Sequence, residues 1–249
     1  MNRRQLENFV HRKLLSAGWR IQRHTPGPQG WDAARAYWEP AYLQRLGFEP
    51  KTIIDVGVAT GTPDLYNAYP DAQLLLIEPV IEFRDDIEKI LAQRPGVYLG
   101  AALGSEPGER ELYIEPQRPL LTSFYGRHPL ERTGDEPILR RVPVDTLDNA
   151  VARSGCPAPY GLKIDAEGSE LEVIRGATET LRKTDFIIAE VSVLPRFQGS
   201  YGFAEFIAEL DARGFELCDI LDIGRADSSH VTFLDLVLQR KKATCIPSR

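Results

Sequence analysis

The side chains best able to do chemistry are concentrated between positions 162 and 170, where the sequence reads LKIDAEGSE. Asp165 and Glu167 follow a short apolar run typical of a buried strand, and Lys163 lies within that run. Ligands of open α/β sheets bind beyond the carboxyl ends of the strands, so we expect these groups beside the reacting atoms. Carboxylates placed there suit proton transfer. The alternative is structural: Lys163 pairs with a neighbouring acid, and Glu167 stabilises the start of the next helix.

A second group of residues surrounds a glycine-containing turn. Asp55 lies near the end of the apolar run 52–56, and the mostly small residues 57–61 follow it before a helix. Small residues let the backbone approach a ligand, and a helix start offers unpaired N–H groups. Glu78 ends the next apolar run, about 20 residues further on, where a doubly wound sheet holds the acid that binds ribose hydroxyls. The sequence therefore predicts a site for a molecule that carries a ribose.

Two kinds of ligand fit this order of elements, a dinucleotide and S-adenosylmethionine. The dinucleotide fingerprint is G-x-G-x-x-G, but Ala59 replaces its middle glycine and Gly61 comes one residue too early. A pyrophosphate gains nothing from a carboxylate at the mouth of the turn, whereas an ammonium and a sulfonium do, so Asp55 favours S-adenosylmethionine. An NAD(P)-dependent Rossmann-type oxidoreductase is the alternative function. Asp55 and Glu78 as plain caps of strand ends are the structural alternative.

Alternating strands and helices must position these residues. From Lys51 onward the pattern predicts parallel strands joined by right-handed crossovers, in the spatial order 3-2-1-4-5-7-6 with the last strand antiparallel. We expect an added strand at 111–114 and a long irregular loop over 115–137. The expected strands of the main sheet are 52–56, 74–77, 97–99, 161–165, 186–191, 215–218 and 233–238.

Capping residues predict where the helices begin. Ser169 and Glu172 have the spacing of a capping box, and Asp145 is the expected cap of a helix that runs through Val151. Further helices are expected at 81–93 and 203–213. Before Lys51 the pattern predicts an amphipathic helix over 1–21 and a second helix over 32–46, kinked or split at Pro40.

The motifs that carry a family resemblance lie at 54–57, 77–79, 100–104, 122–124, 144–148 and, most specifically, 162–177. Together they resemble the FkbM-type methyltransferase family over roughly 52–240. The resemblance implies a doubly wound, Rossmann-like seven-stranded α/β methyltransferase fold, here with an N-terminal helical extension. It also implies S-adenosylmethionine as donor and, usually, O-methylation of sugars or natural-product hydroxyls. Family members often carry Asn-x-Gly after the first turn residues, where this chain has VATG at 58–61, so we expect an altered turn.

Individual roles follow from the strand-end argument and from the resemblance. Asp165 is the expected base for the acceptor hydroxyl, with Glu167 and Glu190 as alternatives at neighbouring strand ends. Ser123, Lys163 and His230 are expected on the acceptor side, with Arg118 or Arg127 near a polar or anionic acceptor group. The residues expected to bind the donor are Asp55, Gly57, Thr60, Gly61, Glu78, Ala101 and Ala102. The expected domains are a helical extension over 1–50, a methyltransferase domain over 51–242 and a tail over 243–249.

Bulk properties of the 249-residue chain narrow the possible classes of protein and of partner further. A net charge of −6 argues against a nucleic-acid partner, and no apolar run is long enough for an integral membrane segment. We expect a cytoplasmic protein, because no secretory signal is evident and 3 cysteines are too few for a disulfide framework. The expected partner is a small-molecule hydroxyl acceptor or a glycan, and a homodimer is left open. No ligand spacing indicates a metal, although the carboxylates could hold a divalent ion. A third hypothesis is a methyltransferase-like binding protein without catalysis.

Overall fold

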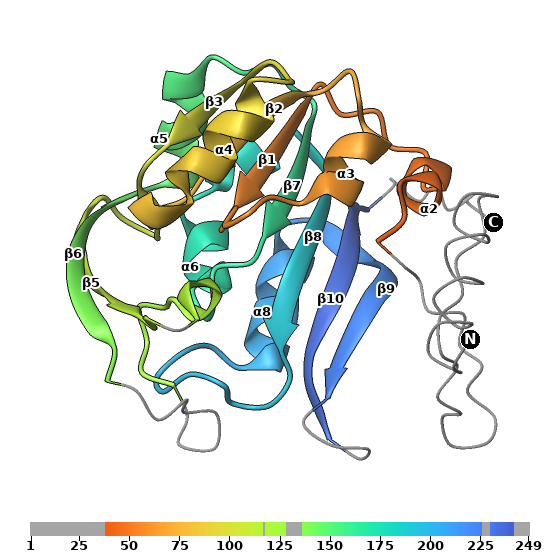
Figure 1. Ribbon diagram of the computed structural model, residues 1–249. Helices are drawn as coiled ribbons and strands as arrows, with labels where there is room; N and C mark the ends of the chain where they lie inside the picture. Colours follow the sequence, from red (N-terminus) through yellow and green to blue (C-terminus); the bar gives the residue numbers. More distant parts are fainter. Residues whose placement is uncertain (1–37, 117, 128–135, 226–229, 242–249) are drawn as a thin grey trace, which may run out of the picture. The chain divides into compact units, whose positions relative to one another are not determined.

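A seven-stranded sheet with helices on both faces forms the framework of the protein (Figure 1). The computed structural model describes residues 38–116, 118–127, 136–225 and 230–241, which all lie in one compact unit of the chain. The strand order is β3-β2-β1-β7-β8-β10-β9. Because the three added strands form a sheet of their own, this order equals the expected 3-2-1-4-5-7-6, and the doubly wound fold is confirmed.

The central strands are buried on both faces, which explains their continuous apolar runs. Every residue of β1 and β7 is buried. β1 pairs in parallel with β2 and β7, and β10 lies antiparallel between β8 and β9, as expected. The strands of this sheet are β1 Thr52–Val56, β2 Gln73–Ile77, β3 Gly96–Leu99, β7 Tyr160–Ile164, β8 Thr184–Ser192, β9 Phe215–Arg225 and β10 Val231–Arg240.

Alternate residues of β1 belong to two hydrophobic clusters on opposite faces of the sheet. Ile53 packs in the cluster that includes residues of α2, α3 and α4, whereas Ile54 and Val56 pack in the cluster that includes residues of α5 to α8. The helices of the first face are α2 Pro40–Arg45, α3 Pro63–Ala68 and α4 Arg84–Leu91, the last preceded by the 3₁₀ turn η1 Ile81–Phe83. Those of the second face are α5 Leu147–Ser154, α6 Glu170–Arg175, α7 Thr178–Leu181 and α8 Phe203–Ala212. None of the helices in the described part of the chain is long and apolar enough to cross a membrane.

The segment before Lys51 is described only from Trp38 onward. The expected helix over 1–21 and the start expected at Asp32 lie outside the described residues. Pro40 is the first residue of α2, where its missing N–H breaks no helical hydrogen bond. The proline therefore marks a helix start, and the left-handed Gly47 (φ +76°) follows the helix end.

A second, three-stranded sheet lies beside the main one, in the order β4-β6-β5 (Figure 1). Its strands are β4 Ala102–Leu103, β5 Gly108–Ile114 and β6 Ile138–Asp145. β5 contains the strand expected at 111–114, but β6 was not predicted, because only Val142 and Val144 face the interior. An isolated bridge between Tyr113 and Ser123 then ties the following loop to β5.

One predicted helix cap is wrong, and a second forms only in part. Asp145 ends β6, and Thr146 caps α5 instead, its hydroxyl accepting a hydrogen bond from the Asn149 backbone N–H at 3.2 Å. Ser169 does hold the N-cap position of α6, as expected, but its hydroxyl makes no capping hydrogen bond. The carboxylate of Glu172 contacts side chains of the second sheet and its loop rather than the helix start, so the capping box does not form.

Candidate active site

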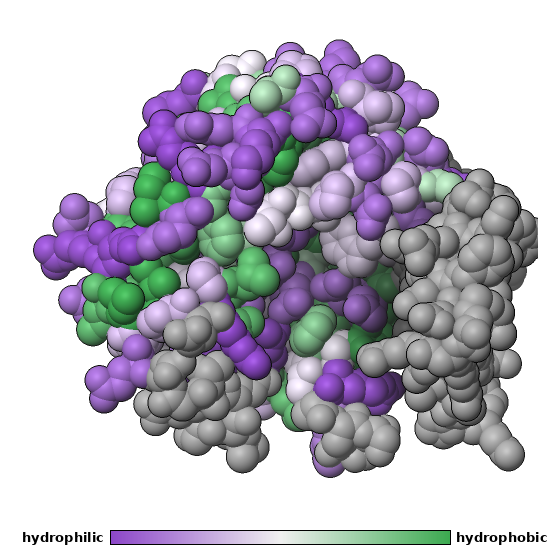
Figure 2. Space-filling model, in the orientation of Figure 1, coloured by the Kyte–Doolittle hydropathy of each residue, from purple (hydrophilic) through white to green (hydrophobic). Residues whose placement is uncertain are grey.

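Two adjoining cavities open at the carboxyl ends of the central strands. The first, of about 230 Å³, lies beyond β1 and β2 and is covered by residues 119–124. The second, of about 270 Å³, lies beyond β1, β7 and β8 and beside β10. Gly57, Ala59, Leu120 and Asp165 line both. Hydrophilic and hydrophobic side chains meet in the middle of the face shown in Figure 2.

The turn after β1 brings the backbone to the point where the cavities meet. Gly57 has φ +75°, and a Cβ atom there would lie 1.8 Å from the carbonyl oxygen of Asp165. Only glycine fits, because β1 and β7 end in direct backbone contact. Ala59 also has a left-handed backbone, with φ +46°. Later in the same turn, Thr60 and Gly61 line the second cavity.

Glu78 stands at the end of β2 in the wall of the first cavity, and it is only 5% exposed. Its two carboxylate oxygens accept hydrogen bonds from the backbone N–H groups of Ala59 (3.0 Å) and Val80 (2.8 Å). A carboxylate has about four acceptor positions, so about two are left for a ligand. Burial raises the pKa of Glu78 to about 7, despite these two hydrogen bonds.

Asp55 is fully buried and lines neither cavity. One carboxylate oxygen accepts hydrogen bonds from the hydroxyls of Thr62 (2.9 Å) and Tyr66 (2.5 Å), and the other lies 3.3 Å from Lys163 Nζ. The side chain that was expected to meet the ligand therefore faces the start of α3 and the lysine. It contributes to the cavities by holding these neighbours.

Lys163 is buried in the wall of the second cavity. Its ammonium donates a hydrogen bond to the carbonyl oxygen of Gly57 at 3.0 Å and lies 3.5 Å from a carboxylate oxygen of Asp165. Burial lowers the pKa of Lys163, but the carboxylates of Asp55 and Asp165 outweigh burial and raise it above its ordinary value. The lysine therefore stays charged and joins the turn after β1 to the end of β7.

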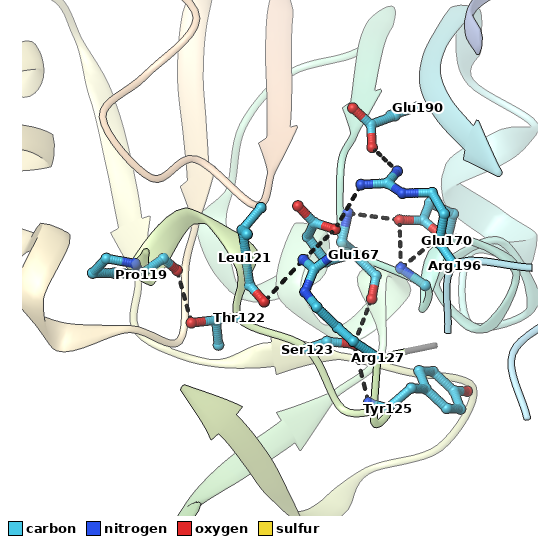
Figure 3. A network of polar contacts seen from close by, with 12 residues as sticks. Pro119, Leu121, Thr122, Ser123, Tyr125, Arg127, Glu167, Glu170, Glu190 and Arg196 are labelled. Atoms are coloured by element: carbon cyan, nitrogen blue, oxygen red, sulfur yellow. Dashed lines mark hydrogen bonds and ion pairs between the residues drawn. The ribbon is translucent and has the colours of Figure 1, made fainter. Parts of the chain in front are cut away.

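The turn that follows β7 is held from two sides (Figure 3). Glu167 has φ +45°, a backbone strain of the kind found at ligand-binding sites. The carboxylate of Glu170 accepts hydrogen bonds from the N–H groups of Ala166 (2.9 Å) and Gly168 (3.0 Å). From the loop, the Ser123 hydroxyl donates to the carbonyl oxygen of Glu167 at 2.5 Å. These contacts fix Asp165 and Glu167 at the cavity walls.

Two arginines stand among the acids (Figure 3). Arg127 and Arg196 each place a guanidinium nitrogen 3.3 Å from the same carboxylate oxygen of Glu167, and Arg196 also donates to Glu190. Burial and the neighbouring Asp165 raise the pKa of Glu167 to about 7 and that of Glu190 to about 9, although the arginines act in the opposite direction. Burial therefore disfavours the charged form of both acids, and of Glu190 more strongly than of Glu167.

Asp165, Glu167 and Glu190, the three acids expected to be catalytic, lie together. One carboxylate oxygen from each lies within 4.8 Å of the others, a spacing that a divalent ion could bridge. Arg196 already places positive charge between Glu167 and Glu190. The cluster therefore has a cation of its own, and its geometry does not require a metal.

The other residues expected at the site divide into two groups. Ala101, Ala102 and Ser123 line the first cavity, together with Thr122 and Phe124 of the loop. Arg118 and His230 line neither cavity, and His230 is exposed just before β10. Of the three residues expected on the acceptor side, Ser123 thus lines the first cavity and Lys163 the second, whereas His230 lines neither.

Several residues at the site were not predicted. Asp235 had a usable signal, a single carboxylate inside the apolar run FLDLVL. In the sequence, Trp38 was more readily explained as a packing residue, and Leu120 as part of an irregular loop. Arg196 reaches the acids from the segment after β8, where no periodicity indicates a direction.

A doubly wound sheet with an acid after its second strand and a glycine turn after its first defines a class of proteins that bind nucleoside-containing cofactors. Within that class, the sequence profile described as methyltransferase FkbM domain matches residues 55–217. The chain belongs to this family, which confirms the resemblance seen in the sequence.

Known proteins similar to the chain are also methyltransferases. It is 28% identical over 145 residues to the hexuronic acid methyltransferase AglP of Haloferax volcanii, covering 57% of this chain and 56% of that protein. The chain thus spans just over half the length of this curated relative. Among solved structures, it resembles the magnesium protoporphyrin IX methyltransferase ChlM of Synechocystis PCC 6803 (12% identity, TM-score 0.43, covering 81% and 76% of the two chains). It also resembles the precorrin-6y C5,15-methyltransferase of Geobacter metallireducens GS-15 (12% identity, TM-score 0.45, covering 87% and 94%). Similarity this low says nothing about the reaction of this chain.

Proposed function

We propose that the protein is an S-adenosylmethionine-dependent O-methyltransferase that acts on a hydroxyl of a sugar or of a natural-product-like small molecule. The observation that carries the proposal is the charge of the first cavity. Glu78 and Asp165 line it, together with Glu167, which pairs with Arg127 and Arg196 outside the lining; no lysine or arginine among the described residues lines it. Such a wall attracts a cationic sulfonium and repels a pyrophosphate. It therefore supports the methyl donor over NAD(P), the alternative cofactor.

The polar atoms of the first cavity also fit a nucleoside. Glu78 has acceptor positions left for ribose hydroxyls. The hydroxyl of Ser169 is buried at the same cavity and makes no hydrogen bond within the described part of the chain. A buried polar group without a partner is costly, so a ligand that bonds to Ser169 gains stability. We propose that Glu78, Ala101 and Ala102 hold the nucleoside end of the donor and that Gly57, Thr60 and Gly61 contact its amino-acid end.

Bound S-adenosylmethionine would supply a methyl group already activated by the positive charge on its sulfur. The chain must then orient an acceptor oxygen and accept its proton. We assign proton acceptance to Asp165, because its side chain lines both cavities and is 36% exposed. A base in hydrogen-bond reach contributes about 10²–10⁴-fold to such a step.

The neighbouring acids take different parts in this proposal. With a pKa of about 9, Glu190 is protonated at neutral pH and suits the donation of a hydrogen bond to the acceptor. With a pKa of about 7, Glu167 can receive the proton from Asp165 and pass it to solvent. Lys163 holds Asp165 in place, its ammonium lying 3.5 Å from that carboxylate.

The donor is tested by thermal unfolding in the presence of S-adenosylmethionine, S-adenosylhomocysteine or NAD. A ligand at 100 times its dissociation constant adds about 2.7 kcal/mol, or about 5–10 °C in Tm for a chain of this size. We expect this rise with the first two ligands and none with NAD. A rise in Tm with NAD alone would contradict the methyltransferase proposal and favour an oxidoreductase. Binding of the donor without transfer to any acceptor would indicate a binding protein without catalysis.

Transfer to oxygen is tested with a deuterated methyl donor and a panel of glycosides, polyketide alcohols and amines. We expect deuterated methyl ethers by mass spectrometry. Products methylated only on nitrogen would contradict O-methylation and leave the donor assignment intact. Parallel reactions with a chelator test whether the three acids need a divalent ion.

A further inference from the structure

Two residues outside the family-matched segment line part of the second cavity. That segment ends at 217 and begins at 55, whereas Trp38 precedes it and Asp235 follows it, and both line this cavity. The indole N–H of Trp38 donates a hydrogen bond to a carboxylate oxygen of Asp235 at 2.9 Å. This wall therefore belongs to the flanks of the chain rather than to the part that defines the family.

The indole is held by its hydrogen bond to Asp235 and by the packing of Trp38 against the core cluster that contains Leu43, and the helix after it is anchored as well. Tyr42, in the α2 helix that follows Trp38, donates a hydrogen bond to Asp219 of β9, while Trp38 bonds to β10. Leu43 of the same helix is fully buried. A ring held in this way loses little further freedom when a ligand binds, so it can serve as a preformed surface.

The charges of the second cavity favour some ligands and exclude others. Its described lining includes the carboxylates of Asp165 and Asp235, the carboxyl group of Glu190 and one cationic side chain, Lys163. That ammonium is already close to the carboxylates of Asp55 and Asp165. Beside Asp235, a ligand carboxylate would meet negative charge with no spare cation in the described lining. Hydroxyl groups would instead find carboxylate acceptors.

An aromatic ring and hydroxyl acceptors side by side are the two halves of a site for a hydroxylated ring. The face of an indole packs against apolar C–H groups, while polar groups at the rim bind hydroxyls. Building on the proposed function, we infer that Trp38 and Asp235 form the selective wall of the acceptor site and that this site takes an uncharged, hydroxylated ring such as a neutral glycoside. A uronate is disfavoured, although the curated relative from Haloferax volcanii is named for a hexuronic acid.

The test uses Trp38 as its own reporter. The full chain carries 3 tryptophans, and Trp19→Phe with Trp31→Phe leaves Trp38 alone. This protein, saturated with S-adenosylhomocysteine, is titrated with a panel of methyl hexosides and, in parallel, with the matching methyl uronides. We expect the fluorescence of Trp38 to change with at least one hexoside, and the matching uronide to bind at least about tenfold more weakly. No response to any hexoside, or tighter binding of the uronides, would overturn the inference.

Two further variants separate this inference from the proposed function. Asp235→Asn should weaken the hexoside by about tenfold and bring uronide binding closer to it, because it removes a negative charge from the wall. The matched control is Asp222→Asn, an exposed acid that pairs with Asp235 across the strands but lies outside the cavity lining. Affinity for S-adenosylhomocysteine, measured by calorimetry, should stay within about twofold in both variants. Equal hexoside binding in the two variants, or a loss of S-adenosylhomocysteine affinity only in Asp235→Asn, would contradict an acceptor wall. Failure of every form to bind S-adenosylhomocysteine would instead count against the proposed function.

Discussion

Glu78 combines burial with acceptor positions that its protein partners leave open. We expect Glu78→Ala to weaken the binding of S-adenosylhomocysteine by about 1–3 kcal/mol, because charge-assisted hydrogen bonds to ribose are lost. Glu78→Gln keeps one acceptor oxygen and should lose less. Calorimetry measures both, with Glu82→Ala as the control, since Glu82 pairs with Arg140 outside the lining of both cavities. Equal affinities in folded wild type and Glu78→Ala would remove Glu78 from the site.

Glu190 links the site to pH. Its pKa rises from an ordinary 4.5 to about 9 in the fold, so the folded state keeps a proton that the unfolded chain releases. The contribution of Glu190 to the free energy of unfolding is fully present below pH 4.5 and is lost as the pH rises through 9. Glu190→Gln cannot titrate at this position, so the Tm of the variant should rise relative to that of the wild type as the pH increases from 5 to 9.

Circular dichroism melts at pH 5, 7 and 9 measure this difference. Glu111→Gln, on an exposed position of β5, is the control and should show no such trend. A Tm difference for Glu190→Gln that does not change with pH would contradict the raised pKa.

At the scale of elements, the contact between the ends of β1 and β7 determines how the two cavities meet. Gly57→Ala would add strain at φ +75° and place a Cβ 1.8 Å from the Asp165 carbonyl oxygen. We expect a loss above about 3 kcal/mol in the free energy of unfolding, measured with urea. Gly155→Ala is the matched control: its φ is +67° with nothing within 4 Å, so it shows the backbone strain alone. Similar losses in the two variants would mean that the strands can separate without cost.

The elements of the main sheet could be predicted because buried parallel strands are written as continuous apolar runs. β6 could not, because its sequence ILRRVPVD places two arginines and a proline on a strand with few inward residues. Strand ends also predicted where the acids would gather. They did not predict that the carboxylate of Asp55 turns toward Thr62 and Tyr66, since alternation fixes opposite faces without saying which partner each face meets. Trp38 and Arg196 reach the site from segments that are distant in the sequence, and a local sequence pattern does not indicate such contacts.

At the scale of the whole molecule, α2 is part of the same packed unit as the sheet, although it precedes the family-matched segment. Leu43 is fully buried in the cluster that also contains Ile53 and Phe186. We propose that the functional domain begins no later than Trp38, rather than at Lys51. Leu43→Ala should then lower the free energy of unfolding by about 2–5 kcal/mol in chemical denaturation, whereas exposed Arg45→Ala should change it by less than about 0.5. A negligible change in the free energy of unfolding for Leu43→Ala would indicate that α2 is a peripheral extension.

The side chain of Leu120 is 57% exposed although it lines both cavities. A hydrocarbon surface of this kind is hydrated only while the site is open, and a molecule seated against it releases that water. Removal of apolar surface from water lowers the heat capacity of the system. The enthalpy of ligand binding should therefore become more negative with each degree of warming, and the slope should be shallower in Leu120→Ala. A side chain that contributes no hydrogen bond and no charge would thus be visible in the temperature dependence of binding.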